Sequence, residues 1–243
     1  MRVLVTGAAG MIGRKLIARL AERPTLRGQA ITALDLHDIV APEAPAFGAA
    51  EVRVHAGDIA AEGAAAALVA RGPELVFHLA GVVSGEAEQN LELGYRVNLD
   101  GTRALLDALR LATGRPRVIY ASSIAVFGAP FPETIPDDFH PTPLTSYGTQ
   151  KLMGELLLAD YTRRGFIDGI GIRLPTICVR PGKPNKAASG FFSDIIREPL
   201  AGQEAVLPCR ALWCTRMPAR ARLSRSCCTP PNSTATPWGH AAT

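Results

Sequence analysis

Tyr147 and Lys151 have the residue types and the spacing of a proton-transfer pair. A separation of four residues places both side chains on one face of a helix, which the pattern predicts over residues 146–164. A free phenol has a pKa near 10, but a neighbouring ammonium and the positive ring of a bound nicotinamide would each favour the phenolate. We therefore predict that Tyr147 accepts a proton from an alcohol and that Lys151 lowers the pKa of the tyrosine. An unrelated surface pair is the alternative.

A serine and an asparagine have side chains suited to the same proton transfer. Ser123 follows a predicted strand, and its hydroxyl can donate to a carbonyl and accept from an alcohol. Capping of a turn is the alternative for Ser123 or for its neighbour Ser122. Asn98 falls inside a helix predicted over residues 91–111, where it either faces solvent or, with Lys151, orders a water that conducts the proton.

A glycine-rich turn lies near the N-terminus, between a predicted strand and a predicted helix. It reads Thr6-Gly7-Ala8-Ala9-Gly10-Met11-Ile12-Gly13. Gly7 permits a tight turn, Gly10 lets backbone N–H groups approach a pyrophosphate, and Gly13 lets the helix pack closely on its strand. The start of the helix then faces the phosphate charge. This junction predicts a dinucleotide-binding turn.

An acidic residue follows at the spacing expected for a ribose contact. Asp35 lies 22 positions beyond Gly13, at the end of a strand predicted over residues 31–35. A carboxylate there can accept hydrogen bonds from the adenosine ribose and repels a 2′-phosphate, which favours NAD over NADP. A solvated loop acid beside Asp38 is the alternative.

Apolar runs and helical spacing alternate along most of the chain. Predicted strands cover 3–6, 31–35, 52–54, 75–79, 118–121 and 170–174, and predicted helices cover 12–20, 60–70, 91–111 and 146–164. Strands that alternate with helices imply right-handed crossovers and a parallel sheet covered on both faces. We therefore predict an α/β protein with a doubly wound parallel sheet, the Rossmann arrangement.

The formal net charge of +4 comes mainly from one end of the chain. Residues 208–243 contain five arginines and no acidic residue, so residues 1–207 carry 21 basic and 22 acidic groups. A nearly neutral body argues against a nucleic-acid or membrane partner. No apolar stretch approaches membrane-spanning length, and residues 1–10 are typical of a strand and turn rather than a signal peptide. We expect a soluble, cytoplasmic protein.

Residues 208–243 also differ from the rest of the chain in pattern. They hold four of the five cysteines, both tryptophans and five prolines, without helical or alternating periodicity. The cysteine spacings match no common zinc template, so we predict no metal site. Two interpretations stay open, namely translation outside the proper reading frame from about Leu207, or a disordered tail.

Together these motifs resemble those of the extended short-chain dehydrogenase/reductase superfamily. The resemblance is carried by Thr6-Gly7-x-x-Gly10-x-x-Gly13, Asp35, Asp58-Ile59, His78-Leu79-Ala80, Asn98, Ser123 and Tyr147-x-x-x-Lys151. Within the superfamily, residues 82–86 and 173–185 look most like segments of D-erythronate dehydrogenases. The resemblance implies an NAD-binding domain over residues 1–175 and a small, incomplete substrate cap over residues 176–207.

The resemblance also implies roles for individual residues. The implied NAD contacts are Met11 and Ile12 at the pyrophosphate, Asp58 and Ile59 around the adenine, Leu79, Ala80 and Gly81 along the path of the cofactor, Lys151, and Pro175 beside the nicotinamide. Tyr147 is the implied proton acceptor, and Ser123 and Ser84 are implied substrate contacts. Arg180 falls where the superfamily places its cap, and it either binds the substrate carboxylate or is a solvated surface charge.

The implied reaction is oxidation of the 2-hydroxyl of a short sugar acid to a ketone, with NAD as cofactor. Two alternatives stay open. One is a nucleotide-sugar epimerase, which oxidises and re-reduces the same carbon. The other is an NAD-binding protein whose catalysis is impaired by the altered C-terminal region.

The predicted helix over residues 146–164 carries more apolar residues than burial on one sheet face requires. The surplus comes from Leu152, Leu156, Leu157 and Leu158. This pattern is compatible with a homodimer formed through paired helices, as in related enzymes.

Overall fold

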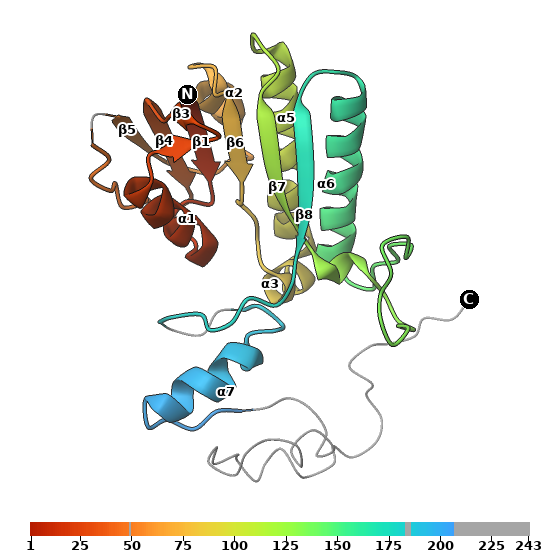
Figure 1. The fold of residues 1–243 in the computed structure, drawn as a ribbon. Coiled ribbons are helices and arrows are strands. Elements are labelled where there is room, and N and C mark those ends of the chain that lie inside the picture. Colours follow the sequence, from red (N-terminus) through yellow and green to blue (C-terminus); the bar gives the residue numbers. More distant parts are fainter. Residues whose placement is uncertain (49, 183–185, 207–243) are drawn as a thin grey trace. The chain divides into compact units, whose positions relative to one another are not determined.

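The computed structural model describes residues 1–48, 50–182 and 186–206 of the chain (Figure 1). The chain divides into two compact units. The first contains Met1–Ile177 and Lys186–Ala188, and the second contains the described residues 178–182 and 189–206. The predicted atypical segment 208–243 lies outside the described residues.

The first unit alternates strands and helices, as the apolar spacing predicts. Its strands are β1 (Arg2–Thr6), β2 (Thr25–Leu26), β3 (Gln29–Ala30), β4 (Ala33–Asp38), β5 (Glu51–Ala56), β6 (Leu75–His78), β7 (Arg117–Ser123) and β8 (Asp168–Leu174). Its helices are α1 (Met11–Glu22), α2 (Ala64–Val69), α3 (Ser84–Gln89), α4 (Leu91–Gly94), α5 (Gly101–Leu111) and α6 (Ser146–Arg163), with a π-helical turn η1 (Tyr95–Asp100) and a 3-10 turn η2 (Ile124–Val126). The β2–β3 hairpin and α3 have no counterpart among the predicted elements.

Six strands form a parallel sheet in the order β5-β4-β1-β6-β7-β8. Thr6 at the end of β1 pairs with His37 of β4 on one side and with His78 of β6 on the other. The direction of the strand order reverses between β1 and β6, and the carboxyl ends at such a reversal border the crevice where these folds bind ligands. The predicted doubly wound parallel sheet is confirmed.

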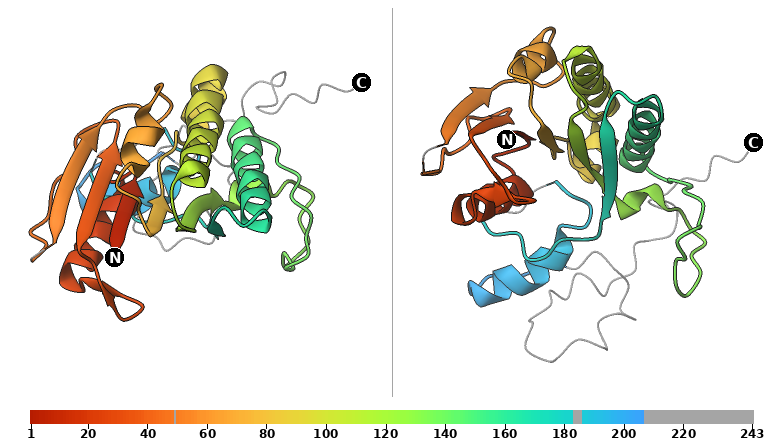
Figure 2. Two further views of the ribbon diagram at one scale, coloured as in Figure 1. Left: turned by 90° about the horizontal axis from the view of Figure 1, so that it is seen from above. Right: turned by 45° about the horizontal axis from the view of Figure 1, so that its top comes forward.

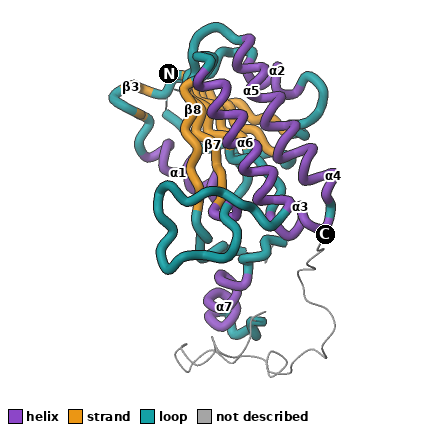
Figure 3. Tube along the Cα trace, turned by 90° about the vertical axis from the view of Figure 1, so that its right-hand side faces the viewer, coloured by secondary structure: helices purple, strands orange, loops and turns teal. Residues whose placement is uncertain are grey.

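Helices cover both faces of the sheet (Figure 2), and an apolar core lies between the sheet and the helices on each face. Because successive strand residues point to opposite faces, Leu4 joins the core under α2, α5 and α6, whereas Val3 and Val5 join the core under α1. Figure 3 shows α5 and α6 running side by side along β7 and β8. The helix that carries Tyr147 and Lys151 is therefore fixed against the last two strands of the sheet.

Close packing of α6 on the sheet depends on two glycines. A Cβ added at Gly154 would lie 2.3 Å from the hydroxyl oxygen of Tyr120, and one added at Gly169 would lie 2.5 Å from Oγ1 of Thr162. Larger side chains would push α6 away from β7 and β8. The glycines therefore help to set the depth at which the face of α6 that carries Tyr147 and Lys151 meets the strand ends.

The leucines of α6 differ in their surroundings. Leu158 is buried and Leu157 packs against the core, whereas Leu156 is 63% exposed. Core packing therefore accounts for part of the apolar surplus. The homodimer stays a prediction.

The helix predicted over residues 91–111 is divided into α4, η1 and α5. The π-helical turn η1 carries Asn98, whose side chain is fully buried. Such turns disturb the regular 3.6-residue spacing and often occur at functional sites. The apolar spacing of the sequence, which assumes 3.6 residues per turn, could therefore not predict this π-helical turn.

The described part of the second unit contains the helix α7 (Phe191–Leu200). Ser193 on α7 accepts a hydrogen bond from the backbone N–H of Arg180 at 3.0 Å, and Arg197 donates to the carbonyl of Arg180 at 2.7 Å. These contacts fix the backbone of Arg180 to α7. No described helix is long and apolar enough to cross a membrane.

Candidate active site

Predicted site residues from distant parts of the first unit gather at the carboxyl edge of the sheet. β1 leads into the glycine-rich turn, β6 leads into Leu79–Gly81, and β7 ends at Ser123. The beginning of α6 adds Tyr147 and Lys151. Open parallel sheets bind their ligands at this edge.

The glycine-rich turn is sterically restricted. Gly7 has a φ of +74°, and an added Cβ would lie 2.6 Å from the backbone nitrogen of Ala80. A Cβ at Gly13 would lie 2.2 Å from the carbonyl oxygen of Gly7. The turn therefore requires glycine at both positions, at Gly7 for its backbone conformation, as predicted, and at Gly13 because a side chain would meet the turn itself rather than the strand.

The start of α1 is suited to an anion. Gly10 precedes the helix without a side-chain cap, and the first turn contains no acidic residue. The first N–H groups of a helix lack partners within it and favour negative charge. These groups, which belong to Met11, Ile12 and Gly13, fit the pyrophosphate of a dinucleotide. Their contact with the cofactor stays a proposal.

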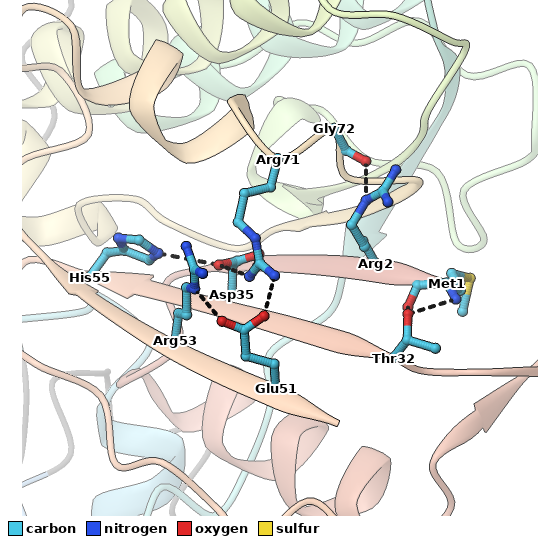
Figure 4. A network of polar contacts seen from close by, with 9 residues as sticks. All are labelled: Met1, Arg2, Thr32, Asp35, Glu51, Arg53, His55, Arg71 and Gly72. Carbon is cyan, nitrogen blue, oxygen red and sulfur yellow. Dashed lines mark hydrogen bonds and ion pairs between the residues drawn. The ribbon is translucent and has the colours of Figure 1, made fainter. Parts of the chain in front are cut away.

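Asp35 does not lie at a strand end. β4 continues to Asp38, so Asp35 lies in mid-strand and is 3% exposed. Its carboxylate accepts hydrogen bonds from Arg71 at 3.2 and 3.3 Å and lies 3.3 Å from Nε2 of His55 (Figure 4). The predicted placement of Asp35 at a strand end is wrong. The basis for a ribose contact is lost with it, because the Arg71 guanidinium already binds this carboxylate.

Asp38 instead ends β4 beside the glycine-rich turn. Its Oδ2 accepts a hydrogen bond from the backbone N–H of Ala9 at 2.9 Å. This is the position that a ribose-binding carboxylate requires. The prediction missed Asp38 because it ended the strand three residues too early. Alternation of the apolar Leu34 and Leu36 was the signal that the strand continues.

The residues predicted around the adenine follow β5. Asp58 forms an ion pair with Arg96 and accepts a hydrogen bond from the backbone N–H of Ala60 at 2.9 Å. Ile59 is buried, and a Cβ added at Gly101 would lie 2.9 Å from its Cγ2. Asp58 and Ile59 therefore have fixed positions, and their contact with adenine stays a proposal.

His78, which belongs to one of the sequence motifs, forms a buried hydrogen-bond chain. Thr102 donates to the carbonyl of Asn98 at 2.7 Å, so its oxygen accepts from Nε2–H of His78 at 2.9 Å. Nδ1 then accepts from the Thr6 hydroxyl at 2.7 Å. Burial lowers the pKa of His78 to about 3, which keeps the ring neutral. This chain links the glycine-rich turn to η1.

Asn98 clamps the backbone after β6. Its Oδ1 accepts from the N–H of Val82 at 2.8 Å, and its Nδ2 donates to the carbonyl of Val82 at 3.2 Å and to Gln150 at 2.8 Å. Both amide protons are therefore used. The alternative that Asn98 faces solvent is wrong, and a role in ordering a catalytic water stays a prediction. Gln150, the buried partner of Asn98 on α6, is a residue of the candidate site that the sequence prediction missed.

Gly81 lies between the clamp and the catalytic helix. A Cβ added at this position would lie 2.9 Å from Oδ1 of Asn98 and 3.3 Å from Nζ of Lys151. Leu79 is tied to the end of β1 by a 3.0 Å hydrogen bond from its N–H to the carbonyl of Thr6. The predicted cofactor path along Leu79, Ala80 and Gly81 thus borders the predicted catalytic lysine.

Tyr147 and Lys151 meet as the helical spacing predicts. Nζ of Lys151 lies 5.8 Å from the centroid of the Tyr147 ring, and the lysine side chain is buried. Desolvation lowers the pKa of Lys151 to about 8. The ammonium is therefore still largely charged at neutral pH.

The pKa of Tyr147 is shifted upward, whereas the sequence-based expectation was a downward shift. Burial raises the pKa of this phenol, although a hydrogen bond with the Ser123 hydroxyl acts in the opposite direction. Desolvation penalises the phenolate more than the neighbouring groups favour it. In the chain alone the net shift is therefore upward, and the lowered tyrosine pKa expected with a bound nicotinamide stays a prediction.

The two serines at the end of β7 have different partners. Ser122 is buried and donates to Glu155, whereas Ser123 bonds with Tyr147 and accepts from the backbone N–H of Ala125 at 3.1 Å. Ser123 thus caps η2, as one alternative predicted, and also contacts the candidate base, whereas its contact with substrate stays a prediction.

The remaining predicted substrate residues lie in different parts of the chain. Ser84 accepts a hydrogen bond from the backbone N–H of Ala188 at 3.0 Å. Pro175 is exposed just after β8, and Arg180 belongs to the second unit. Their contacts with cofactor or substrate stay predictions.

Comparison with known proteins identifies the family. The sequence model of the NAD dependent epimerase/dehydratase family matches residues 3–216. The chain belongs to this family. The resemblance predicted from the sequence motifs is therefore confirmed, and NAD is the cofactor of the family, as the glycine-rich turn predicts.

Individual members of the family give a closer match. The chain is 50% identical over 220 residues to D-erythronate dehydrogenase from Cupriavidus necator and 45% identical over 208 residues to that from Haemophilus influenzae. These alignments cover 88% and 86% of the chain and 67% and 65% of the relatives. The chain thus spans about two thirds of their length.

Among solved structures, the chain is similar to one described as a nucleoside-diphosphate-sugar epimerase from Agrobacterium tumefaciens. The two are 60% identical, with a TM-score of 0.81, over 86% of this chain and 62% of the solved one. This similarity supports the fold and leaves two reaction types to be distinguished.

Proposed function

We propose that the chain is an NAD-dependent dehydrogenase that oxidises the 2-hydroxyl of a short sugar acid, similar to D-erythronate, to a 2-keto acid. The observation that carries the proposal is the grouping of Tyr147, Ser123 and Lys151 at the sheet edge beside the glycine-rich turn. The identity to D-erythronate dehydrogenases supports the substrate class.

In this proposal Tyr147 removes the hydroxyl proton of the substrate. Ser123 donates a hydrogen bond to the same oxygen and positions it beside the phenol. Burial raises the pKa of Tyr147, so the phenolate needs positive charge nearby, which the Lys151 ammonium provides. When bound, NAD supplies the acceptor for the hydride that leaves carbon 2.

Four groups of residues would hold the cofactor. The proposed contacts are the N–H groups of Met11 and Ile12 for the pyrophosphate, Asp38 for the adenosine ribose, Asp58 and Ile59 for the adenine, and Lys151 for the nicotinamide ribose. Asp38 replaces Asp35 because its carboxylate lies beside the glycine-rich turn. Its negative charge opposes a 2′-phosphate and favours NAD over NADP.

A nucleotide-sugar epimerase is the second candidate. The observation that favours it is the 60% identity to the solved structure described as a nucleoside-diphosphate-sugar epimerase. An epimerase would use the same tyrosine but return the hydride to the substrate. Net formation of NADH therefore separates the two reactions.

The decisive experiment follows absorbance of NADH while the purified chain and NAD are supplied with a panel of four- and five-carbon sugar acids. We expect net NADH formation with at least one acid and loss of this activity in Tyr147→Phe. Epimerisation of a nucleotide sugar without NADH release would overturn the dehydrogenase proposal. Equal turnover by Tyr147→Phe would exclude Tyr147 as the base.

A further inference from the structure

Lys151 has a second aromatic neighbour that lies outside the predicted catalytic residues. Its Nζ is 5.0 Å from the ring centroid of Tyr120, closer than the 5.8 Å to the ring of Tyr147. Both Lys151 and Tyr120 are almost completely buried. An ammonium removed from water gains from the electron-rich face of an aromatic ring, and this gain grows as the site is desolvated.

The ring of Tyr120 is held on two sides. It stacks on the ring of His78 with centroids 5.7 Å apart and an interplanar angle of 29°. Thr6 and Thr102 fix His78 by hydrogen bonds. At the other end, the Tyr120 hydroxyl packs so closely against α6 that a Cβ added at Gly154 would lie 2.3 Å from it. The ring is therefore a rigid surface beneath Lys151.

The hydroxyl of Tyr120 does not account for its position. Among the described residues it is buried without a hydrogen bond of normal geometry, and the side chain of Thr102 is the polar group that acts on it. Leaving a buried hydroxyl without a partner costs free energy. The contacts that do distinguish this residue are those of its ring, with His78 and Lys151.

We propose that Tyr120 is a positioning residue that holds the Lys151 ammonium through the face of its ring, at the place where the ammonium acts on Tyr147. The catalytic consequence rests on the proposed function, whereas the contact with Lys151 is a property of the chain itself. Removing the electron density of the ring should make the ammonium less stable and lower the pH at which it loses its proton.

The other titratable groups around Lys151 should not hide the effect of the Tyr120 ring on the titration of this lysine. His78 on β6 stays neutral, since burial lowers its pKa to about 3. Glu155, one turn further along α6, is bound to Arg173 at 2.8 Å and to Ser122. Tyr147 also lies at this site, and burial raises its pKa. A change in the titration of Lys151 can therefore be traced to the ring at position 120.

The test is an NMR titration of the lysine Cε and Nζ signals in the full chain without cofactor. The chain has four lysines, Lys15, Lys151, Lys183 and Lys186, and the Lys151 signal is identified by its loss in Lys151→Met. Tyr120→Phe keeps the ring and serves as the reference. Replacing position 120 with pentafluorophenylalanine keeps nearly the same shape but withdraws electrons from the ring face.

We expect Lys151 to titrate at nearly the same pH in the parent and in Tyr120→Phe, and about one pH unit lower in the pentafluorophenylalanine protein. Tyr120→Leu should lower it similarly if the variant folds. The same Lys151 pKa in Tyr120→Phe and in the pentafluorophenylalanine protein would overturn the proposal.

Kinetics then test the catalytic consequence. In the pentafluorophenylalanine protein, the alkaline limb of kcat/KM should move to lower pH by the same amount as the lysine titration. A structural defect would instead lower kcat at every pH without moving this limb, and that result would count against a positioning role. A shifted titration in a chain without dehydrogenase activity would support the ring contact and argue against the proposed function.

Discussion

The backbone N–H of Ala9 donates a 2.9 Å hydrogen bond to the carboxylate of Asp38, which ties the end of β4 to the glycine-rich turn. Asp35, three residues earlier on the same strand, faces a different partner, the guanidinium of Arg71. The two acids therefore have different expected functions. We expect Asp38 to contact the proposed cofactor and Asp35 to stabilise the fold through Arg71.

Asp38→Asn should weaken cofactor binding and reduce the preference for NAD over NADP. A charged hydrogen bond to ribose contributes about 1.5–3 kcal/mol, so the Kd of NAD should rise about 10- to 100-fold. Loss of the negative charge also removes repulsion of a 2′-phosphate. Calorimetric titrations with NAD and NADP measure both effects.

Asp35→Asn is the matched control for that experiment. It weakens a largely buried ion pair with Arg71, so the free energy of unfolding should fall by about 1–3 kcal/mol. The affinity for NAD should change little. If Asp35→Asn rather than Asp38→Asn altered the NAD preference, the reassignment of the ribose contact would be wrong.

Lys151→Met should stabilise the fold while it abolishes turnover. Burial lowers the pKa of Lys151 from 10.5 to about 8, so the unfolded chain binds more protons between these pH values and stability rises with pH across them. Below pH 8 the buried Lys151 ammonium lowers the free energy of unfolding by the full amount, about 3 kcal/mol. Removing the ammonium should raise the free energy of unfolding at pH 7 by about 1–3 kcal/mol.

Urea denaturation of the parent and of Lys151→Met near pH 7 and near pH 10 checks this prediction. The advantage of the variant should shrink at the higher pH, where the parent lysine is neutral in the folded chain. A variant that is less stable than the parent at both pH values would contradict it.

His78 should make the fold sensitive to acid. Burial lowers its pKa from 6.5 to about 3, so the unfolded chain takes up a proton first as the pH falls. The stability contribution is complete above pH 6.5 and is lost progressively towards pH 3, up to about 4–5 kcal/mol. His78→Gln cannot titrate and should show a shallower loss of stability between about pH 6 and pH 4. If stability fell with pH equally steeply in the parent and in His78→Gln, His78 would not be the source of the acid sensitivity.

Gly81→Ala should damage activity more than stability. The added methyl group would meet Oδ1 of Asn98 at 2.9 Å and Nζ of Lys151 at 3.3 Å. Displacing the lysine should lower kcat/KM about 10- to 100-fold. Gly171→Ala is a suitable control, because its Cβ would meet nothing closer than 3.8 Å. Similar kinetics in the two variants would show that space at Gly81 is not required.

Arg180→Ala tests the proposed carboxylate contact. If Arg180 binds the substrate carboxylate, KM for a sugar acid should rise about 10-fold or more, whereas KM for its neutral lactone should change little. Steady-state kinetics with both compounds measure the difference. Equal changes in the two KM values would remove Arg180 from the substrate site.

Local patterns in the sequence determined much of this protein. Alternating apolar runs predicted the parallel sheet, the spacing of Gly7 and Gly13 predicted the tight turn, and the four-residue separation placed Tyr147 beside Lys151. Each of these features depends on residues that are close in the chain, where backbone geometry relates spacing directly to position.

Only the tertiary structure decided which acid reaches the turn, that Tyr120 lies beneath Lys151, and that burial raises the pKa of Tyr147. A strand end depends on pairing with neighbouring strands, and the ring of Tyr120 meets a lysine 31 residues later in the chain. The pKa depends on how completely the fold removes water from the phenol. The place of Tyr120 and the pKa of Tyr147 are not contained in residue spacing, because each arises from contacts between segments that are distant in the chain.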